Sequence, residues 1–394
     1  MSVETNQKPI LLNTYKLLAE NKKLTVGYVG GSITYGRSAM SDMDGQKGNI
    51  NLSYVNRTSN WLKQVFPDAE IETVNAGVSD TATNFGIYRL EKTLMNENGH
   101  DMPDLVFIEF TSNDWEYDTQ GKPELIIQVE SIIHNIWTIN PYAEIVFLST
   151  SRYAPSISIA AYKEVGLKYN IPFIDVGTPI KEAILKRTGE EIENKEKETL
   201  YYTVDNLHPS HIGYALYFDY IKETLETCLD VGSATKEFYN YKENNASKKC
   251  ENLIDKPKII TAEKIEFSGN AQYLDRKVFV WQHGTGFDLV QATVTENCED
   301  ITGFATAKTT FYGSAFGMLF DIKSGKKPII LRYKIDDGGW KDFRIDLTTR
   351  QHQMYEHPQA FMFAHTLSKT EHRVEIEFLK GSDVYLAGLL VNQK

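Results

Sequence analysis

Residues 24–34, LTVGYVGGSIT, decide how the first part of the chain folds. The stretch begins with a short, mostly apolar run, which predicts a strand buried on both faces of a sheet. Two glycines and a serine follow directly, so the backbone can turn sharply where the strand ends. Ligands of open α/β sheets bind outside the carboxyl ends of the strands. The sequence therefore presents Ser32 at the edge of the sheet where chemistry is expected.

The same alternation of short apolar runs and longer amphipathic stretches continues to about residue 228. Further strands are predicted at 71–75, 105–110, 144–148 and 172–176, and helices at 53–66, 83–95, 123–139, 157–169, 180–186 and 209–228. Apolar strands that alternate with helices are typical of a parallel sheet. Because the crossovers are right-handed, helices cover both faces of that sheet. We therefore predict a three-layer α/β/α domain over residues 1–230.

The hydrophobic pattern changes to period two after a polar, irregular segment at 231–258, which we interpret as the linker between two domains. Two alternating segments, 331–335 and 343–347, flank Asp336–Gly339, and these four residues suit a hairpin turn. Alternating strands with few helical stretches are typical of an antiparallel β-sandwich. We expect such a sandwich, jelly-roll-like, over residues 259–394.

The composition limits the classes of partner. The 394 residues carry a formal net charge of −11, and 41% of them are hydrophobic, which is enough for substantial cores. An acidic chain repels phosphate backbones and anionic lipid surfaces. We therefore expect a neutral small-molecule or oligosaccharide substrate, and neither nucleic acid nor a membrane as partner. The composition does not indicate an oligomeric state.

The N-terminal segment and the cysteines predict the cellular compartment. The first residues lack a basic start followed by an apolar run, so we recognise no secretory leader. No apolar stretch reaches the roughly 18 residues of a membrane span. Cys228, Cys250 and Cys298 are odd in number and widely spaced, which argues against a disulfide framework or a cysteine zinc site. Together these features predict a cytoplasmic protein.

A second polar motif, Asp205–Pro209 (DNLHP), precedes the last predicted helix, and Pro209 suits the first turn of that helix. An Asp three residues before a His can hold one imidazole nitrogen while the other accepts a proton from a hydroxyl. Ser32, His208 and Asp205 would then be nucleophile, base and orienting group. Each motif taken singly has a plainer interpretation. Ser32 would cap a helix after a glycine turn, and Asp205 would be a cap beside an unrelated surface histidine.

Hydrogen-bond donors follow two further predicted strands. Asn75–Gly77 comes after the second strand, and Ser112–Asp114 comes after the third. A tetrahedral intermediate needs donors aimed at its oxyanion. We expect the backbone N–H groups of Ser32 and Gly77 and the side-chain amide of Asn113 to supply them.

Together these motifs resemble the four blocks of SGNH (GDSL-type) hydrolases. The blocks are Gly30–Thr34, Asn75–Gly77, Ser112–Asp114 and Asp205–Pro209, in the family's order, and the resemblance covers residues 20–230. It implies a flavodoxin-like sheet and esterase or lipase activity without a metal or other cofactor. It also implies that Ser32 is the nucleophile, His208 the base, Asp205 its orienting group, and Gly77 and Asn113 oxyanion donors. Two residues depart from the common pattern: Gly31 stands where many members carry Asp, and Ser112 where Gly is commoner.

Residues near these blocks are candidates for contacts with the substrate. Tyr35 and Arg37 follow the nucleophile and either line the acyl pocket or belong to a surface turn. Trp115 is either a platform for a sugar ring or a hydrophobic residue at the rim. His211 is interpreted as an ordinary, partly exposed histidine. Residues 190–198, nearly all charged, are interpreted as a solvated loop or a frayed helix end.

The predicted domain order indicates a substrate class. A β-sandwich after an SGNH domain resembles the layout of two-domain bacterial carbohydrate esterases, some of whose second domains resemble carbohydrate-binding modules. Four aromatic residues of this region are candidates for sugar contacts or for ordinary packing: Trp281, Trp340, Tyr355 and Phe361. We expect a serine esterase that removes O-acetyl groups from oligosaccharides through an acetyl-enzyme. The alternatives are a lysophospholipase or thioesterase, and a glycan-binding protein with a decayed hydrolase domain.

Overall fold

The protein divides into two compact units, Met1–Leu253 and Ile254–Lys394. The computed structural model describes residues 9–20, 22–39, 49–95, 101–114, 121–151, 156–193, 197, 199–230, 237–279, 286–294, 305–322, 328–345 and 359–393. The boundary between the units falls inside the predicted linker 231–258. Residues 237–253 of this linker pack on the first unit. There, the N–H of Tyr241 in helix α10 (Tyr241–Asn244) donates to the carbonyl of Pro141.

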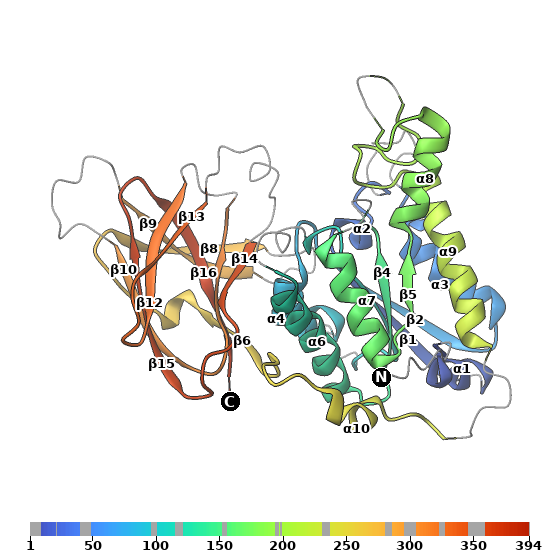
Figure 1. The fold of residues 1–394 in the computed structure, drawn as a ribbon, viewed down its shortest axis with the longest axis horizontal. Helices are drawn as coiled ribbons and strands as arrows, with labels where there is room; N and C mark the ends of the chain where they lie inside the picture. Colours follow the sequence, from blue (N-terminus) through green and yellow to red (C-terminus); the bar gives the residue numbers. More distant parts are fainter. Residues whose placement is uncertain are drawn as a thin grey trace, which may run out of the picture. The chain divides into compact units, whose positions relative to one another are not determined.

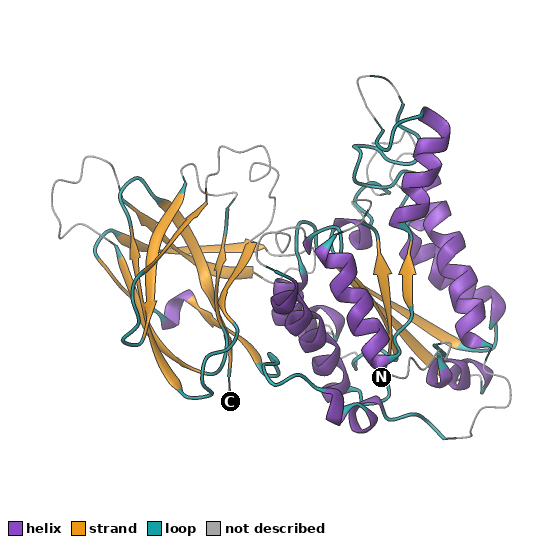
Figure 2. Ribbon diagram, in the orientation of Figure 1, coloured by secondary structure: helices purple, strands orange, loops and turns teal. Residues whose placement is uncertain are grey.

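A five-stranded parallel sheet forms the centre of the first unit, in the order β2-β1-β3-β4-β5 (Figure 2). Its strands are β1 Lys23–Gly30, β2 Glu70–Gly77, β3 Leu105–Glu109, β4 Glu144–Ser149 and β5 Phe173–Asp175. β3 and β4 are buried along their whole length, which explains their continuous apolar runs. The order is that of flavodoxin-like sheets and confirms the predicted fold.

Helices cover both faces of this sheet (Figure 1). One face carries α4 Thr83–Leu94, α6 Lys122–Ile139 and α7 Ile157–Tyr169, and the other carries α1 Leu12–Ala19, α3 Tyr54–Val65, α8 Gly177–Thr188 and α9 His211–Leu229. The second group shares one hydrophobic core with the sheet, in which Tyr28 of β1 packs between Tyr54 and Phe107.

Helix α1 was not expected from the sequence, and the reason is visible in its contacts. It buries two polar residues, Asn13 and Thr14, whose backbone N–H groups donate to the buried carboxylate of Glu144 at 3.1 and 2.8 Å. Glu144 also accepts a bond from the Tyr241 hydroxyl. Because polar residues take part of its buried face, the helix lacks a clear amphipathic pattern.

The second unit consists of two antiparallel sheets with a hydrophobic core between them. One sheet runs β13-β12-β15-β10-β7, and the other runs β14-β11-β16-β9-β8, with β6 added to β16. The strands are β6 Pro257–Thr261, β7 Glu266–Ser268, β8 Ala271–Phe279, β9 Gly286–Thr293, β10 Thr306–Tyr312, β11 Phe316–Phe320, β12 Ile329–Ile335, β13 Lys341–Ile345, β14 Gln359–Ala364, β15 Glu371–Phe378 and β16 Asp383–Asn392. Phe316 of one sheet packs on Phe311 and Tyr333 of the other, which confirms the predicted β-sandwich.

The aromatic candidates for sugar contacts in this unit separate by burial. Phe361 is only 9% exposed and packs against Phe320 and Phe343, so it belongs to the core. Trp340 is 36% exposed, and the cationic groups of Arg332 and Lys334 lie 4.7 and 5.0 Å from the centre of its ring. Trp281 and Tyr355 lie outside the described residues. Along the described part of the chain, no helix is both long and apolar enough to cross a bilayer.

A buried histidine holds the hairpin turn that follows β12. Nδ1 of His372 lies 2.6 Å from the Asp336 carboxylate, and Nε2 lies 2.8 Å from the carbonyl oxygen of Ser368. Burial lowers the pKa of His372, but the two oxygen partners outweigh burial and raise it on balance. Because both ring nitrogens face acceptors, the protonated imidazole satisfies the site, and Nε2 is not placed to act as a base.

This contact predicts that the second unit loses stability as the pH rises. A histidine whose pKa is higher in the folded state stabilises the fold below its ordinary pKa, and that contribution disappears as the pH passes the folded value. Calorimetry of the full chain from about pH 6 to about pH 8.5 should show a falling melting temperature for this unit. His372→Gln should flatten the dependence. An identical slope in that variant would contradict the assignment.

Candidate active site

Ser32 begins the one-turn helix α2 (Ser32–Tyr35), directly after the end of β1. Its side chain is 4% exposed. Gly31 provides the space next to it, because a Cβ added there would lie 2.2 Å from Oδ1 of Asn113. The first helical residue has no partner for its N–H within the helix. The turn therefore presents the Ser32 hydroxyl and N–H next to Gly31, against which the Asn113 side chain packs.

Ser32, His208 and Asp205 form a continuous hydrogen-bonded chain. Nε2 of His208 lies 2.8 Å from the Ser32 hydroxyl oxygen, and Nδ1 lies 2.6 Å from Oδ2 of Asp205. Burial raises the pKa of Asp205, but its hydrogen bond to His208 and the charge of that ring outweigh burial and lower it. An ionised carboxylate only accepts, so Nδ1 carries the proton and Nε2 is free to accept from Ser32.

The loop that carries Asp205 and His208 folds back on itself. Oδ1 of Asp205 accepts the backbone N–H groups of Leu207 and His208, at 3.0 and 2.7 Å. Thr203 and Pro209 form an isolated antiparallel bridge. Helix α9 then begins at His211, and its N-cap is Ser210, whose hydroxyl accepts from two backbone N–H groups of the first turn. The expectation that Pro209 occupies the first turn of this helix is therefore wrong.

A second contact joins this loop to the turn that carries Ser32. The hydroxyl of Ser38, which is fully buried, donates to the backbone carbonyl of Pro209 at 2.6 Å. The hydroxyl of Tyr214 in α9 donates to the carbonyl of Ile33 in α2 at 3.0 Å. These two bonds join segments more than 170 residues apart in sequence and fix the His208 loop over Ser32.

Gly77, which the sequence predicts as an oxyanion donor, makes a hydrogen bond within its own strand end. Its backbone N–H donates to Oδ1 of Asn75 at 2.9 Å, so this donor is already used. A Cβ at Gly77 would lie 2.3 Å from the backbone nitrogen of Tyr35, so the glycine permits close packing of β2 against α2. The side-chain amide of Asn75 stabilises the same contact, because it donates a hydrogen bond to the carbonyl of Thr34 in α2. The turn that follows β2 holds Asp80 with φ of 59°, a left-handed conformation rare in residues other than glycine.

Comparisons with known proteins give a family match and two similar structures. Residues 28–216 match the model of the GDSL-like lipase/acylhydrolase family. Two solved structures are similar across both units: a two-domain esterase (CEX) active on acetylated mannans, at TM-score 0.72 and 18% identity over 98% of this chain and 97% of that chain, and the same kind of esterase co-crystallised with mannopentaose, at TM-score 0.66 and 19% identity over 98% and 96%. No curated protein matches the chain at a significant level. The chain is a carboxylic ester hydrolase.

The remaining candidates around the GDSL-type site are placed as follows. Tyr35 ends α2 and is partly buried, and burial raises the pKa of its phenol. The backbone N–H of Arg37 donates to the carbonyl of Ser32 at 3.1 Å. His211 is partly exposed at the start of α9, as expected. Trp115 lies outside the described residues.

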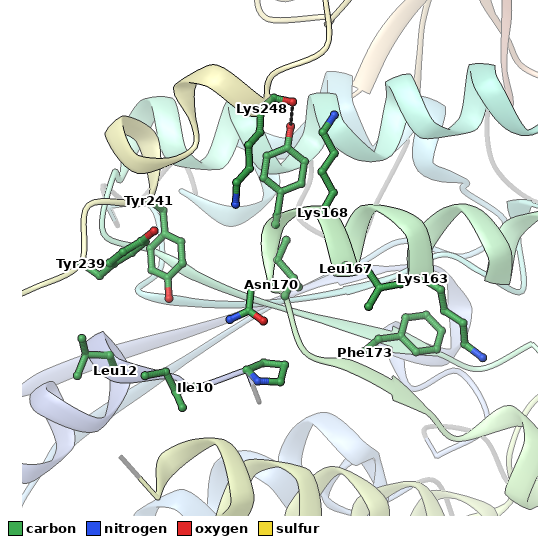
Figure 3. A pocket seen from close by; sticks show the side chains of 14 residues that line it. Ile10, Leu12, Lys163, Leu167, Lys168, Asn170, Phe173, Tyr239, Tyr241 and Lys248 are labelled. Atoms are coloured by element: carbon green, nitrogen blue, oxygen red, sulfur yellow. Dashed lines mark hydrogen bonds between the residues drawn. The ribbon is translucent and has the colours of Figure 1, made fainter. Parts of the chain in front are cut away.

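A large cavity of this domain lies away from the site. It has a volume of about 980 Å³, and Figure 3 shows Tyr239 and Tyr241 on one side of it and Leu167 on the other. Phe173, the first residue of β5, lines the cavity, whereas Ser32 follows the last residue of β1. Since the strands are parallel, the two places lie at opposite edges of the sheet. None of the 14 lining residues is Ser, Cys or His, so the cavity does not hold a serine or cysteine nucleophile beside a histidine base.

Glu193 lies next to the catalytic loop, and the sequence did not indicate a role for it. Its side chain is fully buried, although it belongs to the charged stretch 190–198 that we interpreted as solvated. Its carboxylate accepts the backbone N–H groups of Tyr201, Tyr202 and Thr203 and the hydroxyl of Thr203, at 2.7 to 3.0 Å. It thus holds the segment that leads into Asp205. One glutamate among the five of this charged stretch gave no signal of this role.

Glu193→Gln should slow ester hydrolysis without changing the Ser32 turn. The amide would place an N–H₂ donor against backbone donors, so the loop that carries His208 should shift, and we expect kcat to fall by roughly 10-fold or more. Steady-state hydrolysis of p-nitrophenyl acetate measures this. Glu191→Gln is the matched control, because the Glu191 side chain is 63% exposed. Equal rates in the two variants would show that Glu193 does not hold the loop.

Proposed function

We propose that the chain removes O-acetyl groups from carbohydrates through an acetyl-enzyme on Ser32. The hydrogen-bonded order of Ser32, His208 and Asp205, beside the Asn113 amide, is the observation that carries this proposal. These groups supply a nucleophile, a base with the correct tautomer and a donor for the oxyanion.

In the first half of the reaction, the Ser32 hydroxyl oxygen attacks the acetyl carbonyl carbon while Nε2 of His208 takes the hydroxyl proton. The carbonyl oxygen becomes an oxyanion, for which the N–H of Ser32 and the amide of Asn113 are the donors. His208 then gives its proton to the sugar oxygen as the C–O bond breaks. The sugar alcohol leaves, and Ser32 carries the acetyl group.

In the second half, water replaces the sugar alcohol. His208 takes a proton from the water, whose oxygen attacks the acetyl carbon, and the collapse of the second tetrahedral intermediate releases acetate. The proton returns from His208 to the Ser32 oxygen. Throughout, Asp205 keeps the imidazole oriented and stabilises its protonated form.

Two observations support a carbohydrate as the alcohol part of the ester. The chain carries a formal charge of −11, which favours neutral substrates over anionic ones. The fold, including the second unit, is shared with an esterase active on acetylated mannans. At 18% identity this likeness shows the fold, and the substrate is our proposal.

Ser32→Ala should abolish acetate release from an acetylated mannooligosaccharide. Loss of the nucleophile is expected to lower kcat by a factor on the order of 10⁶, with the melting temperature retained. Ser131→Ala, which removes a buried hydroxyl bonded to the Ile127 carbonyl in α6, is the control and should keep wild-type turnover. Residual acetate release at the wild-type rate in Ser32→Ala would refute the mechanism.

The acyl preference separates deacetylation from the alternatives. Two segments that carry site residues, Ser112–Asp114 and Asp205–His208, consist mainly of polar residues, which favours a short acyl group. We therefore expect kcat/KM for p-nitrophenyl acetate to exceed that for the octanoate by roughly 10-fold or more. A preference for the octanoate would indicate a lysophospholipase or thioesterase. Failure of a fluorophosphonate to label Ser32 would indicate a glycan-binding protein without hydrolase activity.

A further inference from the structure

Glu109 is a fully buried carboxyl group that none of the steps above uses. It is the last residue of β3, its exposure is 0%, and its backbone carbonyl accepts the N–H of Gly31 at 3.3 Å. Gly30, at the end of β1, pairs with Glu109 across the sheet. The carboxyl group therefore lies beneath the turn that presents Ser32. Burying such a group is costly unless hydrogen bonds satisfy it.

Two chains of hydroxyl groups converge on this carboxyl. Oε2 accepts from the Thr34 hydroxyl at 2.8 Å, and the same hydroxyl lies 2.9 Å from the Tyr54 hydroxyl. Oε1 accepts from the Thr150 hydroxyl at 2.6 Å, and that hydroxyl lies 2.8 Å from the Ser112 hydroxyl. An ionised carboxylate can only accept. Both threonines therefore donate to Glu109, and Tyr54 and Ser112 donate to the threonines.

The two chains end on the two sides of the reaction centre. Thr34 is in the one-turn helix α2, two residues after Ser32. Ser112 precedes Asn113, whose amide lies against Gly31. The carboxylate thus connects the element that carries the nucleophile with the element that carries an oxyanion donor.

We propose that Glu109 is a positioning residue, whose ionised carboxylate aligns the Ser32 helix with the Asn113 turn and whose protonation slows turnover. The inference rests on the ester hydrolysis proposed above. When Glu109 takes up a proton, its O–H must donate to one of the two threonines. The hydroxyl of that threonine then has to turn away, and one of the two chains is reversed.

The surroundings place this protonation in the working pH range. Burial raises the pKa of Glu109 to about 7, although the hydroxyls of Thr150 and Thr34 and nearby backbone N–H groups act to lower it. Among the described residues, the phenols of Tyr54 from α3 and Tyr214 from α9 face it, and burial raises the pKa of both, so they stay neutral. From α4, the guanidinium of Arg89 donates to the carbonyl of Gly30 in the same turn.

Glu109→Gln tests the proposal, with p-nitrophenyl acetate as substrate. The amide keeps one acceptor but turns a donor toward the other threonine, so we expect kcat to fall by roughly 10- to 100-fold with KM little changed. In the wild type both His208 and Glu109 must lose a proton, whereas in the variant only His208 must. The acid limb of log kcat/KM should therefore be less steep in Glu109→Gln.

Stability separates positioning from a merely structural role. A carboxyl whose pKa is raised by folding costs stability as the pH rises from its ordinary value through the folded one. Above pH 7, Glu109→Gln should therefore melt at or above the wild-type temperature while it turns over more slowly. The matched control is Glu144→Gln. Glu144 is also fully buried, but it begins β4 at the opposite edge of the sheet, and its loss should leave kcat and the acid limb unchanged.

If Glu109→Gln does not fold, Thr150→Val tests the same connection. It removes one donor to Glu109 and the link to Ser112, and we expect a several-fold fall in kcat. Thr58→Val is its control, because the buried Thr58 hydroxyl has no hydrogen-bond partner within the described structure.

Two results for Glu109→Gln would overturn the proposal. One is a wild-type kcat together with an unchanged acid limb of the pH profile of kcat/KM. The other is a lower kcat together with a lower melting temperature and an unchanged acid limb. Wild-type kcat in Thr150→Val would overturn it as well. Labelling of Ser32 by a fluorophosphonate, followed in parallel, keeps these results apart from a failure of the proposed function. If the wild type is active and labelled at Ser32, and Glu109→Gln is labelled equally fast, the positioning role of Glu109 is refuted while the proposed function stands.

Discussion

The parallel register of β1 between its two neighbours is the constraint on which this site depends. Gly30 pairs with Gly77 of β2 on one side and with Glu109 of β3 on the other. The three strands therefore end at one level, and the turns that follow them meet. The positions of Ser32 and Asn113, and the contacts of Asn75 with α2, depend on that alignment. If one strand shifted by one residue against its neighbour, each of its side chains would point to the other face of the sheet.

Buried polar groups hold this edge of the sheet together from both faces. Arg89, which is 1% exposed, donates from α4 to the carbonyl of Ala76 at 2.7 Å and to the carbonyl of Gly30 at 2.9 Å. Burial lowers its pKa. Glu109 binds the same turn from the neighbouring strand, and Glu193 holds the loop that brings His208. The two carboxylates are bonded to backbone or hydroxyl donors, and the two terminal nitrogens of Arg89 to backbone carbonyls, which makes burial of a charge tolerable.

The hydrophobic pattern of the sequence predicted the fold of both units. It did not predict which polar groups are buried. Hydrophobic period gave the parallel sheet and the β-sandwich. The motifs at strand ends and before the last helix gave Ser32, Asn113, Asp205 and His208 as candidates. Gly77 was assigned correctly to a strand end, but its N–H is occupied by a side chain two residues away. Glu109 bonds partners 75 and 41 residues distant, so its role exists only after folding. The burial of Glu193 could not be predicted because its neighbours in sequence are charged. Helix α1 could not be predicted because polar residues take part of its buried face.

The central claim is that Ser32 carries the acetyl group during turnover. Acid quenching of the wild-type enzyme during steady-state hydrolysis of an acetylated mannooligosaccharide, followed by proteolysis and mass spectrometry, tests it most directly. We expect a single acetyl group on the peptide that contains Ser32, at the side-chain oxygen of that residue. An acetyl group on another residue, or acetate release with no acetylated peptide under conditions that trap the intermediate, would contradict it.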